Sequence, residues 1–463
     1  TDVVASRTVW YVQTEDQLLA STSQRAIVLL LKSFELNEDV FPWMISSGTL
    51  GPGLSWDRRI NMLPGNTRLV LDRKSWSLSI IREPLNYLPA DISTKEHEKK
   101  LKKAIESVFS KLDLDFNKWL LPLSGGVDSR AILLMLKDRP GLKALTWGLR
   151  SSQYNKNNDA YIANQLAEYF DVEHEYFETD VSHGSIEDLF TRFLVAGEGR
   201  VDNISGYMDG FRIWKILHDK GTRGVIRGDE AFGCYAVKSS AEVYRNMGLL
   251  MLEDYDNLRR SLKYFHKNIQ QRPTALLKNK NETLEEWRDR LNREYEFPTI
   301  FASLNDLKLA YVEIINPLIS HRIVEQVMSL PDNLRTRKSL FTRIVVSLCP
   351  DIKFAKHAAI ETRNNILRKN NVVSVIIGEL ETAHSRKLFE EEFLRDVLSQ
   401  IVSSDNGNYS RIKGLSDRII RKISRRLSFR EANDIDMNIV AFRLYLISKM
   451  TRLLSDDAHA LNS

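Results

Sequence analysis

The residues best suited to chemistry form one short loop, Leu123-Ser124-Gly125-Gly126-Val127-Asp128-Ser129. The two glycines let backbone N–H groups approach an anion closely, and the N-terminus of a following helix would add partial positive charge. The hydroxyls of Ser124 and Ser129 can donate hydrogen bonds to phosphate oxygens. Asp128 would be repelled by bare phosphate, so it fits best as a ligand for a phosphate-bound Mg²⁺ ion.

This loop differs from the phosphate loop of the Walker A type. No GxxxxGK(S/T) pattern occurs anywhere in the chain, so the lysine that closes a Walker A loop is missing. The loop therefore suits holding a pyrophosphate unit better than delivering a γ-phosphate. The alternative is a generic Ser/Gly turn at the start of a helix. Because the complete SGGVDS string is present, this alternative is the weaker interpretation.

The flanking segments place the loop between a strand and a helix. Residues 119–123 form a short apolar run, and residues 130–136 are predicted to be helical. The elements that follow alternate between strands at 142–147, 173–177 and 223–226 and helices at 160–169 and 211–218. Such alternation implies a parallel sheet with helical crossovers, so we expect an α/β fold.

The rest of the chain differs in character from this α/β part. Short β-like stretches separated by turns are predicted at 8–12, 17–20, 67–72 and 76–81, and indicate part of a β-rich domain. A proline-containing linker and a helix with apolar spacing from Leu101 to Leu112 follow. Beyond about Tyr235 the periodicity is mostly helical. It includes a basic helix at 411–430 with an apolar stripe, and a flexible loop is expected at 403–408.

Composition excludes several classes of protein. The chain has 463 residues, 43% hydrophobic and 27% charged, which are ordinary globular values for two or three domains. The net charge of +5 does not mark a nucleic-acid protein, and no apolar run is long enough to span a bilayer. The first residues show no basic segment followed by an apolar core, so a secretory signal is absent or already removed. Cys234 and Cys349 are the only cysteines, so we expect a cytoplasmic protein without structural zinc or disulfides.

The loop and its surroundings resemble a known family. SGGxDS is the PP-loop of the ATP pyrophosphatases, and the chain is similar to the asparagine synthetases and their relatives. The similarity continues in Leu145-Thr146-Trp147-Gly148-Leu149, then Asp159, then Glu173-His174-Glu175. It includes an acidic pair followed by Phe-Gly in Arg227-Gly228-Asp229-Glu230-Ala231-Phe232-Gly233, and Leu330-Pro331 followed by Arg335, Lys338 and Pro350.

The opening residues extend this resemblance. Ser6-Arg7-Thr8-Val9-Trp10-Tyr11, Ala20-Ser21 and Leu63-Pro64-Gly65 look like the last strands of the family's N-terminal glutaminase domain. The resemblance thus covers roughly residues 1–360. It implies a PP-loop ATP-pyrophosphatase (adenine nucleotide α-hydrolase-like) parallel sheet, preceded by a partial, β-rich, glutaminase-like (Ntn) segment and followed by a helical C-terminal extension. The implied boundaries are 1–82 for the glutaminase-like part, 83–94 for the linker, 95–360 for the synthetase-like domain and 361–463 for the helical, basic region.

In that family ATP activates a carboxylate as an acyl-adenylate, pyrophosphate leaves, and an amine then attacks to form an amide. The resemblance implies ATP and Mg²⁺ as cofactors, with Asp128 and Asp229 sharing the metal. Lys338 resembles the lysine that stabilises charge during acyl transfer, although the register there leaves Arg335 and Arg337 as alternatives. The residues expected to bind ATP or its pyrophosphate are Leu123, Ser124, Gly125, Gly126, Asp128, Ser129, Trp147, Gly148 and Gly228.

The chain departs from the family in three places. No cysteine stands where the glutaminase nucleophile belongs, so either a separate chain or fragment supplies the first half of that domain or the amine comes from elsewhere. Thr1 is an alternative nucleophile, and a cleavage or boundary residue is the plainer interpretation. Asparagine synthetases carry Gly-Glu-Gly before the acidic pair, whereas this chain has Ile226-Arg227-Gly228. Because that loop helps to form the substrate pocket in the family, aspartate as the substrate is in doubt. The basic helix is either a solvated face or a docking surface for an acidic partner.

These observations favour an AMP-forming amide synthetase with a specialised small-molecule or peptide carboxylate and an amine as substrates, comparable to β-lactam synthetases and lasso-peptide cyclases. The alternatives are a true asparagine synthase that uses glutamine or ammonia, a PP-loop enzyme that modifies RNA, and a non-catalytic nucleotide-binding scaffold. The basic helix would suit RNA, but the glutaminase-like first block and the lack of CxxC pairs make nucleic acid an unexpected partner, and no membrane contact is expected.

Overall fold

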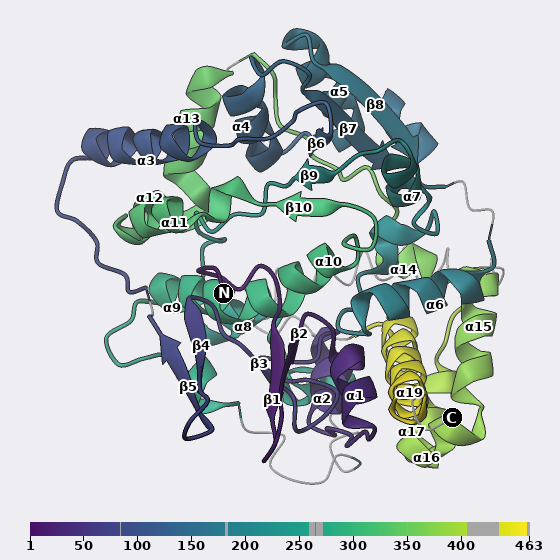
Figure 1. The fold of residues 1–463 in the computed structure, drawn as a ribbon. Coiled ribbons are helices and arrows are strands. Elements are labelled where there is room, and N and C mark those ends of the chain that lie inside the picture. Colours follow the sequence, from purple (N-terminus) through teal and green to yellow (C-terminus); the bar gives the residue numbers. More distant parts are fainter. Residues whose placement is uncertain are drawn as a thin grey trace.

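The main sheet contains five parallel strands, namely β6 (Trp119–Pro122), β7 (Lys143–Gly148), β8 (Glu173–Glu178), β9 (Gly224–Ile226) and β10 (Glu313–Ile315). They lie in the order β10-β9-β6-β7-β8 (Figure 1). The computed structural model describes residues 1–83, 85–180, 184–258, 264, 272–349, 351–404 and 435–460. The predicted α/β fold with a parallel sheet is confirmed.

One strand of this sheet was not predicted. β10 falls in the region where the sequence indicated helices, and it pairs with β9 at the edge of the sheet. Its three residues, Glu-Ile-Ile, are too few to show the alternation that marks a strand. The expectation of a mostly helical region beyond Tyr235 therefore needs this correction.

The strand order creates a switch point between β6 and β9. The chain proceeds from β6 to β7 and β8 on one side and then returns to β9 on the other side of β6. In open α/β sheets the connections diverge at such a point and leave a crevice at the carboxyl ends of the strands. The SGGVDS loop follows β6 and the acidic pair follows β9, so both signatures lie at this crevice.

Helices cover both faces of the sheet. One face carries α3 (Thr94–Phe109), α4 (Val127–Leu136), α5 (Asp159–Tyr169), α11 (His321–Met328) and α13 (Ser339–Leu348), whose apolar residues cluster with Leu121, Ala144 and Ile226. The other face carries α6 (Ile186–Gly197) and α7 (Arg212–Asp219), which pack with Leu145, Phe177 and Val225. Alternate strand residues thus point to opposite cores, as the pleat of a sheet requires.

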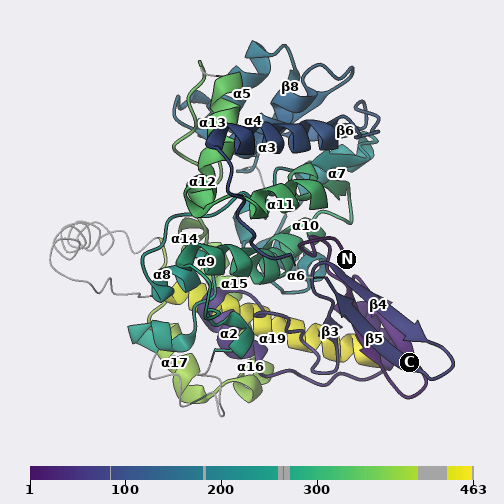
Figure 2. The ribbon, with the colours of Figure 1, turned by 90° about the vertical axis from the view of Figure 1, so that its left-hand side faces the viewer.

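The first eighty residues contain the predicted short strands. β1 (Trp10–Gln13), β2 (Leu18–Ser21) and β3 (Asn61–Met62) form one antiparallel sheet, and β4 (Thr67–Asp72) pairs with β5 (Ser77–Arg82) in a hairpin that projects from the body (Figure 2). Two helices, α1 (Gln24–Leu31) and α2 (Val40–Ser47), interrupt the strands and were not predicted. Nearly all of α2 is buried, so it lacks the polar face that makes a helix recognisable in a sequence.

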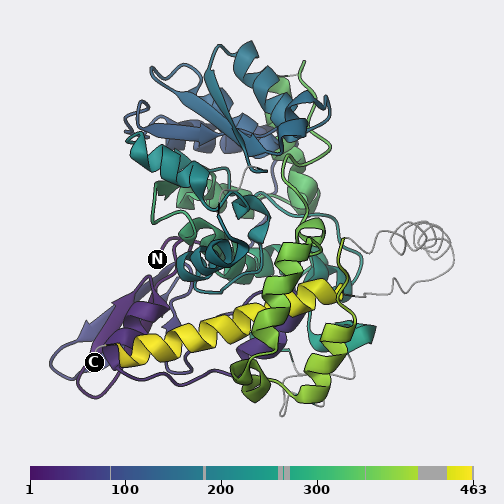
Figure 3. The ribbon, with the colours of Figure 1, turned by 90° about the vertical axis from the view of Figure 1, so that its right-hand side faces the viewer.

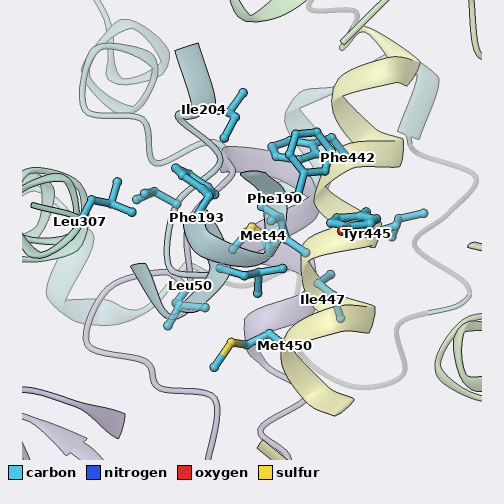
Figure 4. Close-up of a cluster of buried hydrophobic side chains, with 14 of the residues drawn as sticks. Met44, Leu50, Phe190, Phe193, Ile204, Leu307, Phe442, Tyr445, Ile447 and Met450 are labelled. Carbon is cyan, nitrogen blue, oxygen red and sulfur yellow. The ribbon is translucent and has the colours of Figure 1, made fainter. Parts of the chain in front are cut away.

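The long helix α19 (Met437–His459) packs against this first part of the chain. It runs beside α1, α2 and α15 (Asn370–Leu380) and reaches from the C-terminal helices to the N-terminal strands (Figure 3). Phe442, Tyr445 and Met450 of α19 enter the same hydrophobic cluster as Met44 of α2 and Phe190 of α6 (Figure 4). The first and final parts of the described chain therefore share one core.

The remaining helices connect these parts. They are η1 (Arg150–Tyr154), η2 (Ile204–Tyr207), α8 (Ser240–Asn246), α9 (Leu284–Leu291), η6 (Asn292–Phe301, a π-helix), α10 (Ala302–Asp306), α12 (Asp332–Arg335), α14 (Arg363–Ile366), α16 (Ala383–Leu388) and α17 (Glu391–Ser399), together with short 3₁₀ turns. The predicted basic helix at 411–430 and most of the loop at 403–408 lie outside the described residues. None of the helices in the described ranges is long and apolar enough to cross a membrane.

Candidate active site at the switch point of the sheet

The SGGVDS loop is held in shape by hydrogen bonds within the site. The hydroxyls of Ser124 and Ser129 lie 2.9 Å apart, and the backbone N–H of Ser124 donates to Ser129 Oγ at 3.0 Å. The N–H of Gly125 donates to Asp159 Oδ1 at 3.1 Å, and the N–H of Gly126 donates to Ser124 Oγ at 3.2 Å. Gly126 is also the N-cap of α4, where it has no side chain to cap the first turn, which suits that turn to an anionic ligand.

Two of the glycines lie where no side chain fits. A Cβ atom on Gly125 would lie 2.4 Å from Ala355 Cβ, and one on Gly148 would lie 2.6 Å from the carbonyl oxygen of Ala359. Both contacts are made by the segment 351–360, which crosses over the loop. This segment is anchored by the buried Arg130, whose guanidinium donates to the Ile352 and Lys353 carbonyls.

Lys338 reaches the site from the start of α13. Its Nζ lies 2.9 Å from both carboxylate oxygens of Asp128 and 2.6 Å from Glu230 Oε1. Arg337 and Lys338 both have left-handed backbones, with φ of 57° and 55°, which is a strained conformation for residues with side chains. The rings of Phe232 and Phe341 stack at 3.9 Å and join the Glu230 loop to α13.

The position of Lys338 also shows which of the neighbouring basic residues lies at the site. The side chain of Arg335 is fully buried and pairs with Asp289 and Asp332, away from the loop. Of the three basic residues considered from the sequence, Lys338 is the one that the structure brings to Asp128. Its role in catalysis remains a prediction.

Burial and charge oppose each other in this cluster. Burial raises the pKa of the Glu230 carboxyl from 4.5 to about 7, and Asp128 adds to the shift while Lys338 opposes it. Burial also raises the pKa of Asp128, again against the effect of Lys338. For Lys338, burial alone would lower the pKa, but the two carboxylates outweigh it and raise the pKa above its ordinary value. Perturbed groups of this kind cluster at functional sites.

Asp229 lies beside this cluster with partners of its own. Arg227 donates to its Oδ1 at 3.1 Å and Asn305 donates to its Oδ2 at 3.2 Å. Burial opposes ionisation of Asp229, but Arg227 and Asn305 outweigh that effect and hold its pKa below the ordinary value. A Cβ atom on Gly228 would lie 3.1 Å from Asp128 Cβ, so the turn after β9 packs directly on the start of α4.

A cavity of about 300 Å³ opens at this point. Of the residues predicted to bind ATP or metal, those that line it are Leu123, Ser124, Asp128, Ser129, Trp147, Gly228 and Asp229. Gly125, Gly126 and Gly148 are not part of the lining. Sequence reasoning missed the other wall, which consists of Thr146, Arg227 and the segment Ala358, Ala359 and Ile360.

The residues present fit ATP and Mg²⁺. Asp128 and Asp229 face one cavity from two strand ends, and Mg²⁺ is commonly held by one or two carboxylates together with substrate phosphates. No group of three or more acidic, histidine or cysteine side chains suited to a metal occurs among the described residues, so phosphate oxygens would have to complete the coordination. Each carboxylate oxygen has more than one lone pair, so the present hydrogen bonds do not exclude a metal.

A five-stranded parallel sheet with an SGGxDS loop at its switch point defines an α/β protein of the ATP-pyrophosphatase class. The asparagine synthase family model matches residues 118–403, which is more than half of the chain. The chain therefore belongs to the asparagine synthase family. Comparison with curated proteins returned no match.

Proposed function

We propose that the protein is an ATP-dependent, AMP-forming amide synthetase with a specialised substrate. The observation that carries this proposal is the convergence of the SGGVDS loop, Asp128, Asp229 and Lys338 at the carboxyl ends of β6 and β9. A scaffold that only binds nucleotide would have no need to hold two carboxylates, Asp128 and Glu230, against one lysine in a largely buried cluster, because such a cluster costs desolvation energy.

The reaction has two steps. A substrate carboxylate attacks the α-phosphorus of ATP, and the bond to pyrophosphate breaks. An amine then attacks the acyl carbon, the bond to AMP breaks, and the amine loses a proton. Mg²⁺, when bound, neutralises the charge of the leaving pyrophosphate. The loop after β6 binds the phosphates, and Trp147 contributes to the wall on which the adenine would lie.

Lys338 supplies a fixed positive charge beside the loop. It is held by Asp128 and Glu230 beside the loop, so its ammonium is already oriented before a substrate enters. A preorganised cation stabilises negative charge where it develops, on the acyl oxygen and the leaving AMP. Glu230, which was not among the predicted catalytic residues, positions this lysine.

The first 82 residues are proposed to be the C-terminal part of a glutaminase-like domain, with 83–94 as a linker, 95–360 as the synthetase domain and 361–463 as a helical region. Support comes from the small antiparallel sheet of β1, β2 and β3. The hydroxyl of Thr1 donates to the Pro64 carbonyl at 2.6 Å and its α-amine donates to the Thr67 carbonyl at 2.9 Å, so both groups are held against the chain at the start of β4. A separate chain that completes the domain remains part of the proposal.

Exchange of radiolabelled pyrophosphate into ATP tests the proposed function. The purified chain, Mg²⁺, ATP and a panel of carboxylic acids should give acid-dependent exchange. Asp128→Asn should abolish it with the fold intact, since the change removes a charge but little volume. Asp138→Asn, at an exposed position on the C-terminal side of α4, is the matched control and should behave as the parent. Exchange by Asp128→Asn at the parent rate, or ATP binding without exchange for any acid, would favour a scaffold.

A further inference from the structure

A second cavity of about 430 Å³ adjoins the nucleotide cavity. The two share Trp147, Arg227 and Ile360 as common walls, so they are direct neighbours. The volume lies within the range of small-molecule sites in proteins. Its other walls come from η2, α7, α14, and α10 with the residues that follow it.

The most unusual residue of this cavity is Lys308. Its side chain is 3% exposed, and its Nζ donates to the Leu304 carbonyl and lies 5.6 Å from the ring centres of Tyr207 and Trp214. Within the described residues it forms no ion pair with a carboxylate. A buried ammonium without a counter-ion is costly, and burial together with Arg227 lowers the pKa of Lys308 well below its ordinary value, against the weaker effects of Asp229 and Asp306.

Two further cations line the cavity, and each has a carboxylate behind it. Arg227 pairs with Asp229, and Arg363 pairs with Asp202, which also accepts from Arg443 of α19. These guanidinium groups are therefore fixed in place and largely compensated. Of the three cations that line the cavity, Lys308 is the one that has no carboxylate partner among the described residues.

The lining carries no negative charge of its own. Among the described residues that form it, none is acidic, and the remaining polar groups include the amides of Asn203 and Asn364. An ammonium group placed here would meet three cations and no carboxylate. A ligand with an anionic group would give Lys308 its counter-ion, and the rings of Trp147, Tyr207 and Trp214 would pack against a carbon chain.

We propose that this cavity binds the acyl substrate, and that the substrate is a dicarboxylic acid without a free ammonium group. One carboxylate reaches the nucleotide cavity past Trp147 and is activated, while the other pairs with Lys308. That a carboxylate is the group activated by ATP rests on the proposed function. The preference of the cavity for an anionic ligand follows from its lining alone. It sets this chain apart from an enzyme that activates a free acidic amino acid.

Three five-carbon acids separate the possibilities. Glutarate has two carboxylates, glutamate adds an ammonium group to the same skeleton, and pentanoate has a single carboxylate. Binding of each is measured by calorimetry with Mg²⁺ and α,β-methylene ATP present, and pyrophosphate exchange is measured in parallel with ATP. Glutarate should bind and exchange best. Lys308→Met should weaken glutarate binding by about 10- to 100-fold, as expected for loss of a charge-assisted bond, and leave nucleotide binding within about twofold.

A second variant avoids the buried position. Asn364 is an exposed lining residue, so Asn364→Asp adds a negative charge to the cavity without disturbing the core, and should weaken glutarate binding. Asn365→Asp, the adjacent exposed residue of α14 outside the lining, is the matched control and should leave binding unchanged. Equal effects of the two changes would overturn the proposal.

The possible outcomes test the ligand preference of the cavity separately from the proposed reaction. If glutamate or pentanoate gives better exchange than glutarate, the proposed function stands and the charge preference is wrong. If glutarate binds in a Lys308-dependent manner but no acid supports exchange, the cavity assignment stands and the proposed function fails. If glutarate does not bind, the cavity assignment is wrong whatever the exchange assay shows.

Discussion

Replacing Glu230 with glutamine is expected to remove a loss of stability that the parent protein shows as the pH rises. The pKa of this carboxyl is raised from 4.5 to about 7, chiefly by burial. A group with a raised pKa in the folded state contributes stability that is fully present below about pH 4.5 and is lost as the pH rises through about 7. The difference between the two pKa values corresponds to about 3 kcal/mol. Glutamine resembles the neutral acid, so Glu230→Gln should not lose this stability.

Urea unfolding in metal-free buffer measures the effect. Between pH 5 and pH 8 the free energy of unfolding of the parent should fall by about 2–3 kcal/mol relative to that of Glu230→Gln. EDTA is present in both, because a bound cation would stabilise the ionised carboxylate. Glu15→Gln, at an exposed position in the first part of the chain, is the control and should follow the parent. Parallel pH profiles for the parent and Glu230→Gln would refute the reasoning. Stability gained on removing a carboxylate would mark Glu230 as a residue kept for function.

Three other outcomes are expected. Lys338→Ala should slow amide formation by about 10²- to 10³-fold with less than about tenfold change in ATP affinity, measured by single-turnover kinetics and nucleotide titration, because the lysine acts where charge develops; weaker ATP binding with normal turnover would place it on the phosphates instead. Gly125→Ala should destabilise the loop by about 1–3 kcal/mol in urea unfolding, since its Cβ would lie 2.4 Å from Ala355 Cβ; an unchanged midpoint would show that the covering segment yields. Glutamine should release no glutamate with the purified chain, which lacks a cysteine in its first part; glutamate release would return attention to Thr1.

The parts of the fold that the sequence predicted are those with a strong local pattern. β6, β7 and β9 are largely apolar runs bounded by turns, β8 follows from the strand–helix alternation, and the SGGVDS loop marks the start of α4 by its own composition. β10 and α2 were missed because one is too short and the other too uniformly buried to show a period. Both are stabilised by contacts with segments distant in sequence, which no local pattern records.

The same distinction applies to the candidate site. Asp128 and the two serines were identified from their own loop, and Lys338 through the family resemblance. The pairing of Lys338 with Glu230, and the wall formed by Ala358, depend on tertiary contacts. Lys308 stands between Leu307 and Leu309, and nothing in that short stretch distinguishes a buried lysine from an exposed one.

The packing of α19 against α1 and α2 has a consequence for how the chain is made. Arg443 of α19 donates to the Ile45 carbonyl, 398 residues earlier. At roughly 5–20 residues per second, a ribosome needs about 20–80 s to synthesise what lies between them. During that time the apolar sides of α1 and α2, with Val28 and Met44, have not yet met the helix that completes their core. A nascent chain in this state is a natural client for chaperones, and fragments that stop short of α19 should be recovered from cells mainly as aggregates.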